Sequence, residues 1–181
     1  MKPHAVPLFG LLDRDLKPGL HPYLRVLPGA DQSPGLHRIA PDPKMRERLL
    51  REAVVYIKPG GGFAYVDVET PCIVLAQDYY RTGSDLDLYM DMLHELTHIR
   101  QHFEGIDLWD ERYAYVDRPT EIEGYAVAVE EGRRLGMDDA DVIEHLTNPW
   151  MDDEDIHRLL GHTQDFLAKA GPNAAHHARV G

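Results

Sequence analysis

The chain has 181 residues, of which 43% are hydrophobic and 28% are charged, a composition typical of one globular domain. The formal net charge of −12 argues against general nucleic-acid binding, because an acidic surface repels phosphate backbones. The single cysteine, Cys72, excludes an internal disulfide, fits a reducing compartment and lies in an apolar run, where we expect a structural thiol. The sequence contains no secretory signal pattern and no apolar run near the ~20 residues that span a bilayer, so we expect a cytoplasmic protein without membrane contact.

Proline and glycine dominate the start of the chain. Residues 1–41 contain seven prolines and four glycines. Because proline fixes φ and removes a backbone donor, we expect an extended, mostly irregular N-terminal extension. Whether it is a flexible arm or a strap packed over the domain is left open. The domain itself is expected at residues 42–170.

A short helix and three strands are expected next. The helix begins at Asp42-Pro43, which is typical of an N-cap followed by proline at the first helical position. The β-branched and aromatic run at 54–57 predicts a strand, and the glycines at 60–62 predict a turn, since they lack the spacing of a phosphate loop. We expect a second strand at 63–68 to pair with the first. Residues 72–76 are apolar throughout and predict a third, buried strand.

Helices are expected in the second half of the chain. Ser84 followed by Asp87 is typical of a helix N-terminus, and this helix should run to about residue 102, before Gly105. Residues 106–118 are polar and aromatic and indicate a loop. Beyond it the patterns predict helices at about 119–135, 138–146 and 152–169, and a flexible tail at 171–181.

The run His94-Glu95-Leu96-Thr97-His98 lies inside the helix expected from residue 84. Residues four apart share a helix face at about 6 Å, so His94 and His98 direct their imidazoles to one point. Two imidazoles at that separation suit a tetrahedral Zn²⁺ ion. Glu95 is rotated by about 100° and can lie beside the open metal position, where it would take a proton from water. The alternative is a pair of incidental surface histidines.

Catalytic zinc needs a third protein ligand and an open fourth position. The metzincin pattern would place a glycine and a histidine three and six residues after His98, but the chain has Gln101 and Glu104 there. The other common solution is a carboxylate from a later helix. Glu121 and Glu123 both offer one.

Helix geometry separates these two glutamates. At about 100° per residue, Glu121 lies in the middle of an apolar, small-residue face, whereas Glu123 lies about 200° away on a charged face. A carboxylate buried on an apolar face needs a cation, which zinc would supply. Gly124 and Ala128 are small enough to let this helix approach the His94 helix closely. We therefore predict Glu121 as the third ligand, with Glu123, or two solvated carboxylates near a helix start, as alternatives.

With these motifs the chain resembles the gluzincin clan of zinc metallopeptidases, including the ImmA/IrrE-like proteins and the minigluzincins. The resemblance covers roughly residues 53–135 and ends on Glu121-x-x-Gly124, which is similar to the Glu-x-x-Ala-Asp/Asn signature of several gluzincin groups. Gly124 stands in place of the alanine and Tyr125 in place of Asp/Asn. The resemblance implies an α+β, zincin-like metallopeptidase domain at 42–170: a small, mostly antiparallel sheet packed on the active-site helix, followed by a helical half. An edge strand would bind extended peptide by main-chain pairing.

The sequence thus predicts a zinc peptidase acting on peptide or protein substrates, with Glu95 as the general base. A zinc-binding regulatory module with a vestigial site is one alternative, although Glu95 argues against it, and a zinc enzyme acting on a small molecule is another. For Gln101 and His102 a solvated surface role is favoured over support of a ligand. The oligomeric state is left open. Three side chains could stabilise an oxyanion: Tyr113, Tyr115 and Tyr125. For each of them, packing is the commoner role.

Overall fold

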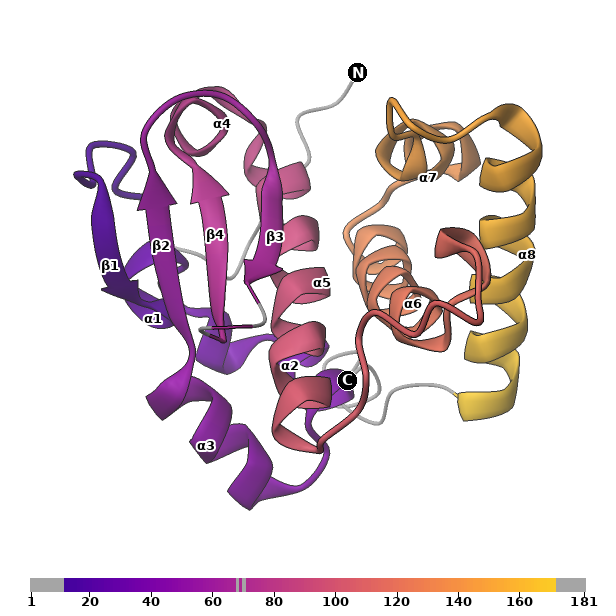
Figure 1. The fold of residues 1–181 in the computed structure, drawn as a ribbon, viewed down its shortest axis with the longest axis horizontal. Helices are drawn as coiled ribbons and strands as arrows, with labels where there is room; N and C mark the ends of the chain where they lie inside the picture. Colours follow the sequence, from indigo (N-terminus) through magenta and orange to yellow (C-terminus); the bar gives the residue numbers. More distant parts are fainter. Residues whose placement is uncertain (1–11, 68, 70, 172–181) are drawn as a thin grey trace.

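The structure, a computed structural model, describes residues 12–67, 69 and 71–171. The expected tail from residue 172 onward and the first eleven residues of the expected extension lie outside the described residues. The fold is α+β, with a four-stranded sheet at one side of the molecule and helices covering and extending it (Figure 1).

The sheet is mixed. Its strand order is β1 (Gly19–Pro22), β2 (Val54–Lys58), β4 (Cys72–Ala76) and β3 (Ala64–Asp67). The β1–β2 and β3–β4 pairs are antiparallel, whereas β2 and β4 run parallel.

The expectation that the strand near 63–68 pairs with the strand at 54–57 is wrong, because β4 lies between them. All five residues of β4 are buried. An apolar strand of this kind is best accommodated at the centre of a sheet, with neighbours on both edges and both faces covered.

Residues 12–41 are part of the folded domain, so the expectation of a mostly irregular segment is wrong for them. They form β1 and three short helices: α1 (Tyr23–Val26), the 3₁₀ helix η1 (Ala30–Gln32) and α2 (Pro34–Ile39). The prolines lie where a missing N–H is tolerated. Pro22 ends an edge strand, and Pro34 is the first residue of α2, where Ser33 Oγ accepts from the amides of the next turn.

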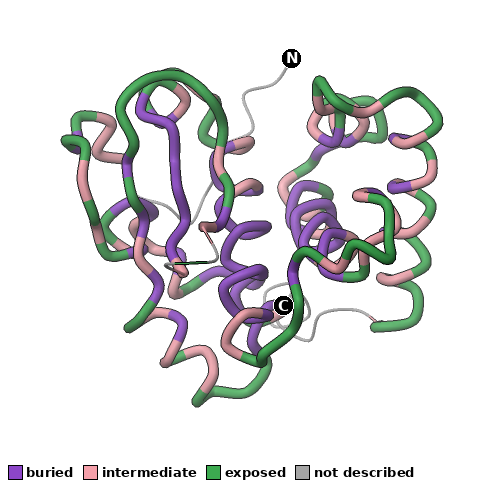
Figure 2. Tube along the Cα trace, in the orientation of Figure 1, coloured by how far each residue is buried: buried purple, intermediate pink, exposed green. Residues whose placement is uncertain are grey.

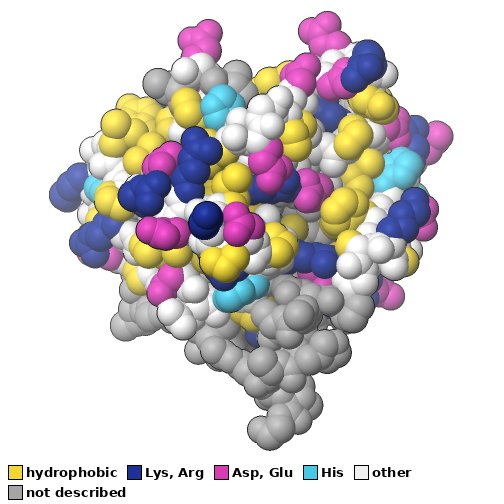
Figure 3. Space-filling model, turned by 90° about the horizontal axis from the view of Figure 1, so that it is seen from below, with side chains coloured by type: hydrophobic (Ala, Val, Ile, Leu, Met, Phe, Trp, Pro, Cys, Tyr) yellow, Lys and Arg dark blue, Asp and Glu magenta, His cyan; other side chains and the backbone are white. Residues whose placement is uncertain are grey.

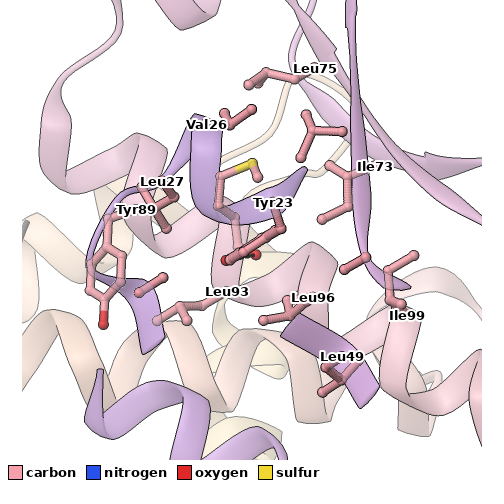
Figure 4. Close-up of a cluster of buried hydrophobic side chains, with 14 of the residues drawn as sticks. Tyr23, Val26, Leu27, Leu49, Ile73, Leu75, Tyr89, Leu93, Leu96 and Ile99 are labelled. Atoms are coloured by element: carbon pink, nitrogen blue, oxygen red, sulfur yellow. Dashed lines mark hydrogen bonds between the residues drawn. The ribbon is translucent and has the colours of Figure 1, made fainter. Parts of the chain in front are cut away.

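The main hydrophobic core lies between the sheet and helix α5 (Asp85–Phe103), and the early segment fills part of it. Tyr23 is fully buried there, and its hydroxyl donates to the carbonyl of Met92 at 3.1 Å. Figure 4 shows residues of α1, the sheet and α5 converging in this core: Tyr23, Val26, Leu27, Ile73, Leu75, Leu93, Leu96 and Ile99.

The elements around α5 follow the expected helix signals. Asp42 caps α3 (Pro43–Glu52), and Ser84 Oγ accepts from the amide of Asp87 at the start of α5. α5 ends just before Gly105, whose positive φ of 75° suits glycine at a helix stop. A further helix, α4 (Gln77–Thr82), follows β4 directly and was not expected. Figure 2 shows β4 and most of α5 as buried.

The helical half packs on the opposite side of α5 (Figure 1). It contains η2 (Tyr115–Asp117), α6 (Pro119–Arg134), α7 (Asp139–Leu146) and α8 (Asp153–Ala170). A second hydrophobic cluster joins these elements to Met90 of α5. No helix in the described ranges combines the length and the apolar character that a membrane span requires.

Charges of both signs are interspersed on the face shown in Figure 3. Opposite charges are also paired along single helices: on α3, Arg48 pairs with Glu52 one turn later at 3.0 Å. Pairs of this exposed kind contribute little to stability, and they keep opposite charges mixed rather than gathered into one field.

Candidate metal centre

Helix α5 places His94 and His98 on one face, both buried. Their Nε2 atoms lie 2.9 Å apart, and the rings meet edge to face with centroids 4.6 Å apart. The two imidazoles therefore converge on one point, as their spacing of four residues predicts. They are not surface histidines.

Glu121, in the first turn of α6, completes the group. Its Oε2 atom lies 3.2 Å from Nε2 of His94 and 3.5 Å from Nε2 of His98, and its side chain is only 6% exposed. One ligand atom from each residue lies within 4.8 Å of the other two. Glu121, rather than Glu123, is thus the glutamate that the fold brings to the histidine pair.

The spacing of these atoms fits a divalent metal ion. Ligand bonds of about 2.0–2.1 Å in tetrahedral geometry separate donor atoms by roughly 3.4 Å, close to the contacts that Glu121 makes with the histidines, while the two Nε2 atoms lie closer together, at 2.9 Å. The contacts of Glu121 lack the geometry of a hydrogen bond, so Oε2 is a buried acceptor without a donor among the described residues. A cation would satisfy it.

The three groups are also coupled electrostatically. Burial raises the pKa of Glu121, but the facing histidines outweigh burial and hold the pKa of this carboxyl well below its usual range. Burial lowers the pKa of His98, yet Glu121 outweighs that effect and raises the pKa of His98 to about 9. The pocket therefore favours positive charge next to the Glu121 carboxylate, which a bound cation would supply.

Gly124 lets α6 approach α5 closely, as predicted from the small residues on this face of the helix. A Cβ added at Gly124 would lie 3.0 Å from both Cε1 and Nδ1 of His94. The ring of Tyr125 also packs edge to face against this imidazole, with centroids 4.3 Å apart. His94 Nδ1 is buried without a hydrogen-bond partner among the described residues, so on that side the ring is positioned by packing, while Nε2 contacts His98 and Glu121.

Glu95 lies beside the metal group and is buried. Burial raises the pKa of its carboxyl, although the nearby His94 and His98 act in the opposite direction. Glu95 and His94 both line an open cleft of about 790 Å³. The lining of this cleft comes from β3, α4, α5, η2, α6 and α7 and from residues beside them, and it includes Phe63, Tyr79, Asp87, Asp91, Tyr115, His145 and Trp150.

Two of the three candidate tyrosines line this cleft. The hydroxyls of Tyr115 and Tyr125 are 2.7 Å apart, and Asn148 Nδ2 donates to Tyr125 at 3.0 Å. Burial raises the pKa of both phenols, so both stay protonated. Tyr113 is 41% exposed and is not among the residues that line the cleft.

Comparisons with known proteins identified no relative of this chain. No family model, no curated protein and no solved structure matches this chain. The case for a function therefore rests on the geometry of the cleft and of the His94, His98 and Glu121 group.

The structure also brings residues to the centre that sequence reasoning placed at the surface. Gln101 is 1% exposed and hydrogen-bonded to His98, so the expectation of a solvated residue is wrong. Glu123 is not on a solvated charged face: it pairs with buried Arg100 and accepts from Gln101 at 2.8 Å. Arg118 was not singled out, yet its Nη1 lies 3.7 Å from Oε1 of Glu121. For Gln101, the sequence did offer a signal: it follows His98 by three residues, a spacing at which two helical side chains can touch.

Proposed function

We propose that this protein is a zinc-dependent peptidase of the gluzincin type. The observation that carries the proposal is the convergence of His94, His98 and Glu121 beside the Glu95 carboxylate, at the wall of an open cleft. A structural zinc site is closed, with four protein ligands, whereas a catalytic site has three and leaves one position open. Three ligands next to a cleft therefore support catalysis over a purely structural role.

Zinc, when bound, would act as a Lewis acid: it would polarise the substrate carbonyl and lower the pKa of water, so that water loses a proton more readily and becomes a better nucleophile. Glu95 accepts the proton of the attacking water and then delivers it to the departing amine nitrogen. Because burial raises the pKa of Glu95, its carboxylate is a stronger proton acceptor than a solvated one.

The tyrosine pair offers a donor to the developing oxyanion. Within the pair one hydroxyl donates to the other, and Asn148 donates to Tyr125. Whichever of the two phenols donates, the hydroxyl hydrogen of the other phenol takes no part in these contacts. We propose that this hydrogen stabilises negative charge on the substrate oxygen.

An edge strand beside the cleft supports a peptide substrate over a small molecule. β3 is the last strand of the sheet, and Phe63 and Ala64, at its start, line the cleft. An edge strand has unpaired main-chain groups, so an extended peptide can add to it as a further strand. Such a peptide would lie along the wall that faces His94 and Glu95.

A peptide-library digest with zinc-loaded protein tests this proposal. We expect cleavage by the wild type and a loss of about 10²–10⁴-fold in the Glu95→Gln variant, because the proton acceptor is removed. The variant should still bind stoichiometric zinc, which metal analysis measures, since Glu95 is not a ligand. Zinc-loaded wild type that cleaves no peptide would contradict the peptidase assignment. Loss of zinc in Glu95→Gln would contradict the role of Glu95.

A further inference from the structure

We infer that Gln101 is a positioning residue that sets the tautomer of His98 and joins the two ligand-bearing helices. The inference rests on the proposed metal site and assigns a role to a residue outside the ligand set. Gln101 follows His98 by three residues on α5 and is almost fully buried against α6.

The orientation of the Gln101 amide follows from its partners. Nε2 of Gln101 lies 3.1 Å from the carbonyl oxygen of Thr120 and 2.8 Å from Oε2 of Glu123. Both partners are acceptors only, so the amide NH₂ group must face them. Oε1 of Gln101 therefore faces Nδ1 of His98, at 2.8 Å.

This arrangement dictates where His98 carries its proton. An amide oxygen only accepts, so Nδ1 of His98 must be the donor. In the neutral ring the lone pair is then on Nε2, the atom that faces Glu121 and Nε2 of His94. A metal ligand needs this tautomer, and an outer partner on the second ring nitrogen is the usual way to hold it.

Gln101 also connects α5 to α6 at the point where Glu121 is presented. Thr120 directly precedes Glu121, and Glu123 follows two residues later. Arg100, on α5, pairs with the same Glu123 carboxylate that accepts from Gln101. One amide thus fixes a ligand of α5 and the backbone next to the ligand of α6. Nδ1 of His94 has no comparable partner among the described residues, and this ring makes its polar contacts only through Nε2, with His98 and Glu121.

Zinc affinity, measured by competition with a chromophoric chelator, tests the inference without any activity assay. We expect Gln101→Leu to weaken zinc binding about 10–100-fold, the usual cost of losing an outer partner of a ligand. The double variant Gln101→Glu with Glu123→Gln exchanges carboxylate and amide, so it keeps an acceptor for His98 and should stay within about tenfold of wild type. Gln164→Leu, on the exposed surface of α8, is the matched control and should not change the affinity.

A second readout reports the tautomer itself. In the ¹⁵N NMR spectrum of the zinc-loaded wild type, we expect the His98 proton on Nδ1, protected from exchange, and the same signal in the double variant. A merely structural role for Gln101 would not determine this signal. Zinc coordination through Nδ1 of His98 would overturn the inference, even if Gln101→Leu fails to fold.

The affinity results separate the inference from the proposed function. Wild-type zinc binding with unchanged affinity in Gln101→Leu would overturn the role of Gln101 and leave the proposed function intact. A double variant as weak as Gln101→Leu would show that the acceptor facing His98 is not what matters, and would also overturn it. A wild type that binds no zinc would overturn both.

Discussion

Two glutamates two positions apart on one helix have different roles because their side chains diverge. Glu121 faces the histidine pair, and its Oε2 is a buried acceptor without a donor in the described part of the chain. We expect Glu121→Ala to weaken zinc binding by at least 10–100-fold, because it removes a ligand rather than a supporting contact. A chelator-competition titration measures the loss. Unchanged affinity would mean that another group completes the site.

Glu123 is the natural comparison, and its contacts with Arg100 and Gln101 show that its carboxylate is not simply solvated. Its side chain is 29% exposed and pairs with Arg100, whose side chain is 10% exposed. We expect Glu123→Ala to reduce the free energy of unfolding by about 1–3 kcal/mol, because a largely buried guanidinium loses a partner. Urea denaturation measures this change. A cost below about 0.5 kcal/mol would show that Glu123 is solvated after all.

Gly124 is a third residue whose identity matters for the site. A methyl group there would press on the ring of His94 at 3.0 Å, and that ring cannot move away without leaving the metal position. We expect Gly124→Ala to weaken zinc binding and to cost about 1–3 kcal/mol, as overpacked sites do.

The matched control for this substitution is Gly161→Ala on α8, where an added Cβ meets nothing within 4 Å. It should gain about 0.5–1 kcal/mol from helix propensity and leave zinc affinity unchanged. Chelator competition and urea denaturation on both variants give the comparison. A gain in stability at Gly124 equal to that at Gly161 would argue against close contact between α6 and His94.

Among the helices and strands, local signals predicted the bounds of α5 and α6 well. Ser84 and Gly105 bound α5, and Pro119 opens α6, because caps and stops depend on a few neighbouring residues. Helix period also predicted that Glu121 faces the histidines. The buried position of Gln101 was missed because its hydrogen-bond partner Glu123 lies on another helix. Periodicity along α5 alone does not reveal that contact.

Strand order could not be obtained in the same way. The short glycine turn after β2 is typical of a hairpin, which would make β2 and β3 neighbours. The insertion of β4 between them depends on contacts that form only when the sheet assembles around its most apolar strand. The early strand and helices were missed because proline-rich composition was weighed above positions such as Leu36, which is fully buried.

The early segment gives a prediction at this scale. Leu36 of α2 is fully buried in the main core, whereas Leu20 of β1 is 68% exposed. We expect Leu36→Ala to cost about 2–5 kcal/mol and Leu20→Ala less than about 0.5 kcal/mol. Chemical denaturation of both variants checks this. Equal, small costs would show that residues 12–41 are a loosely attached strap.

In the molecule as a whole, the group formed by His94, His98 and Glu121 lies where two hydrophobic clusters meet. α5 contributes Leu93 and Leu96 to the cluster under the sheet and Met90 to the cluster of the helical half. His94 and His98 come from this shared helix, and Glu121 comes from α6. A metal held by these ligands therefore links α5 to the helical half in addition to side-chain packing.

Metal binding should for this reason stabilise the protein as one unit. A ligand that binds only the folded state adds about 2.7 kcal/mol at a concentration of 100 times its Kd. For a domain of this length that corresponds to a rise in Tm of roughly 5–10 °C. We expect zinc to raise the Tm of a single cooperative transition, EDTA to reverse the rise, and Glu121→Ala to reduce it. Mg²⁺, which prefers oxygen ligands, should have little effect. Two transitions, of which zinc shifts only one, would contradict this coupling, because α5 carries residues of both clusters and should not unfold with one half alone.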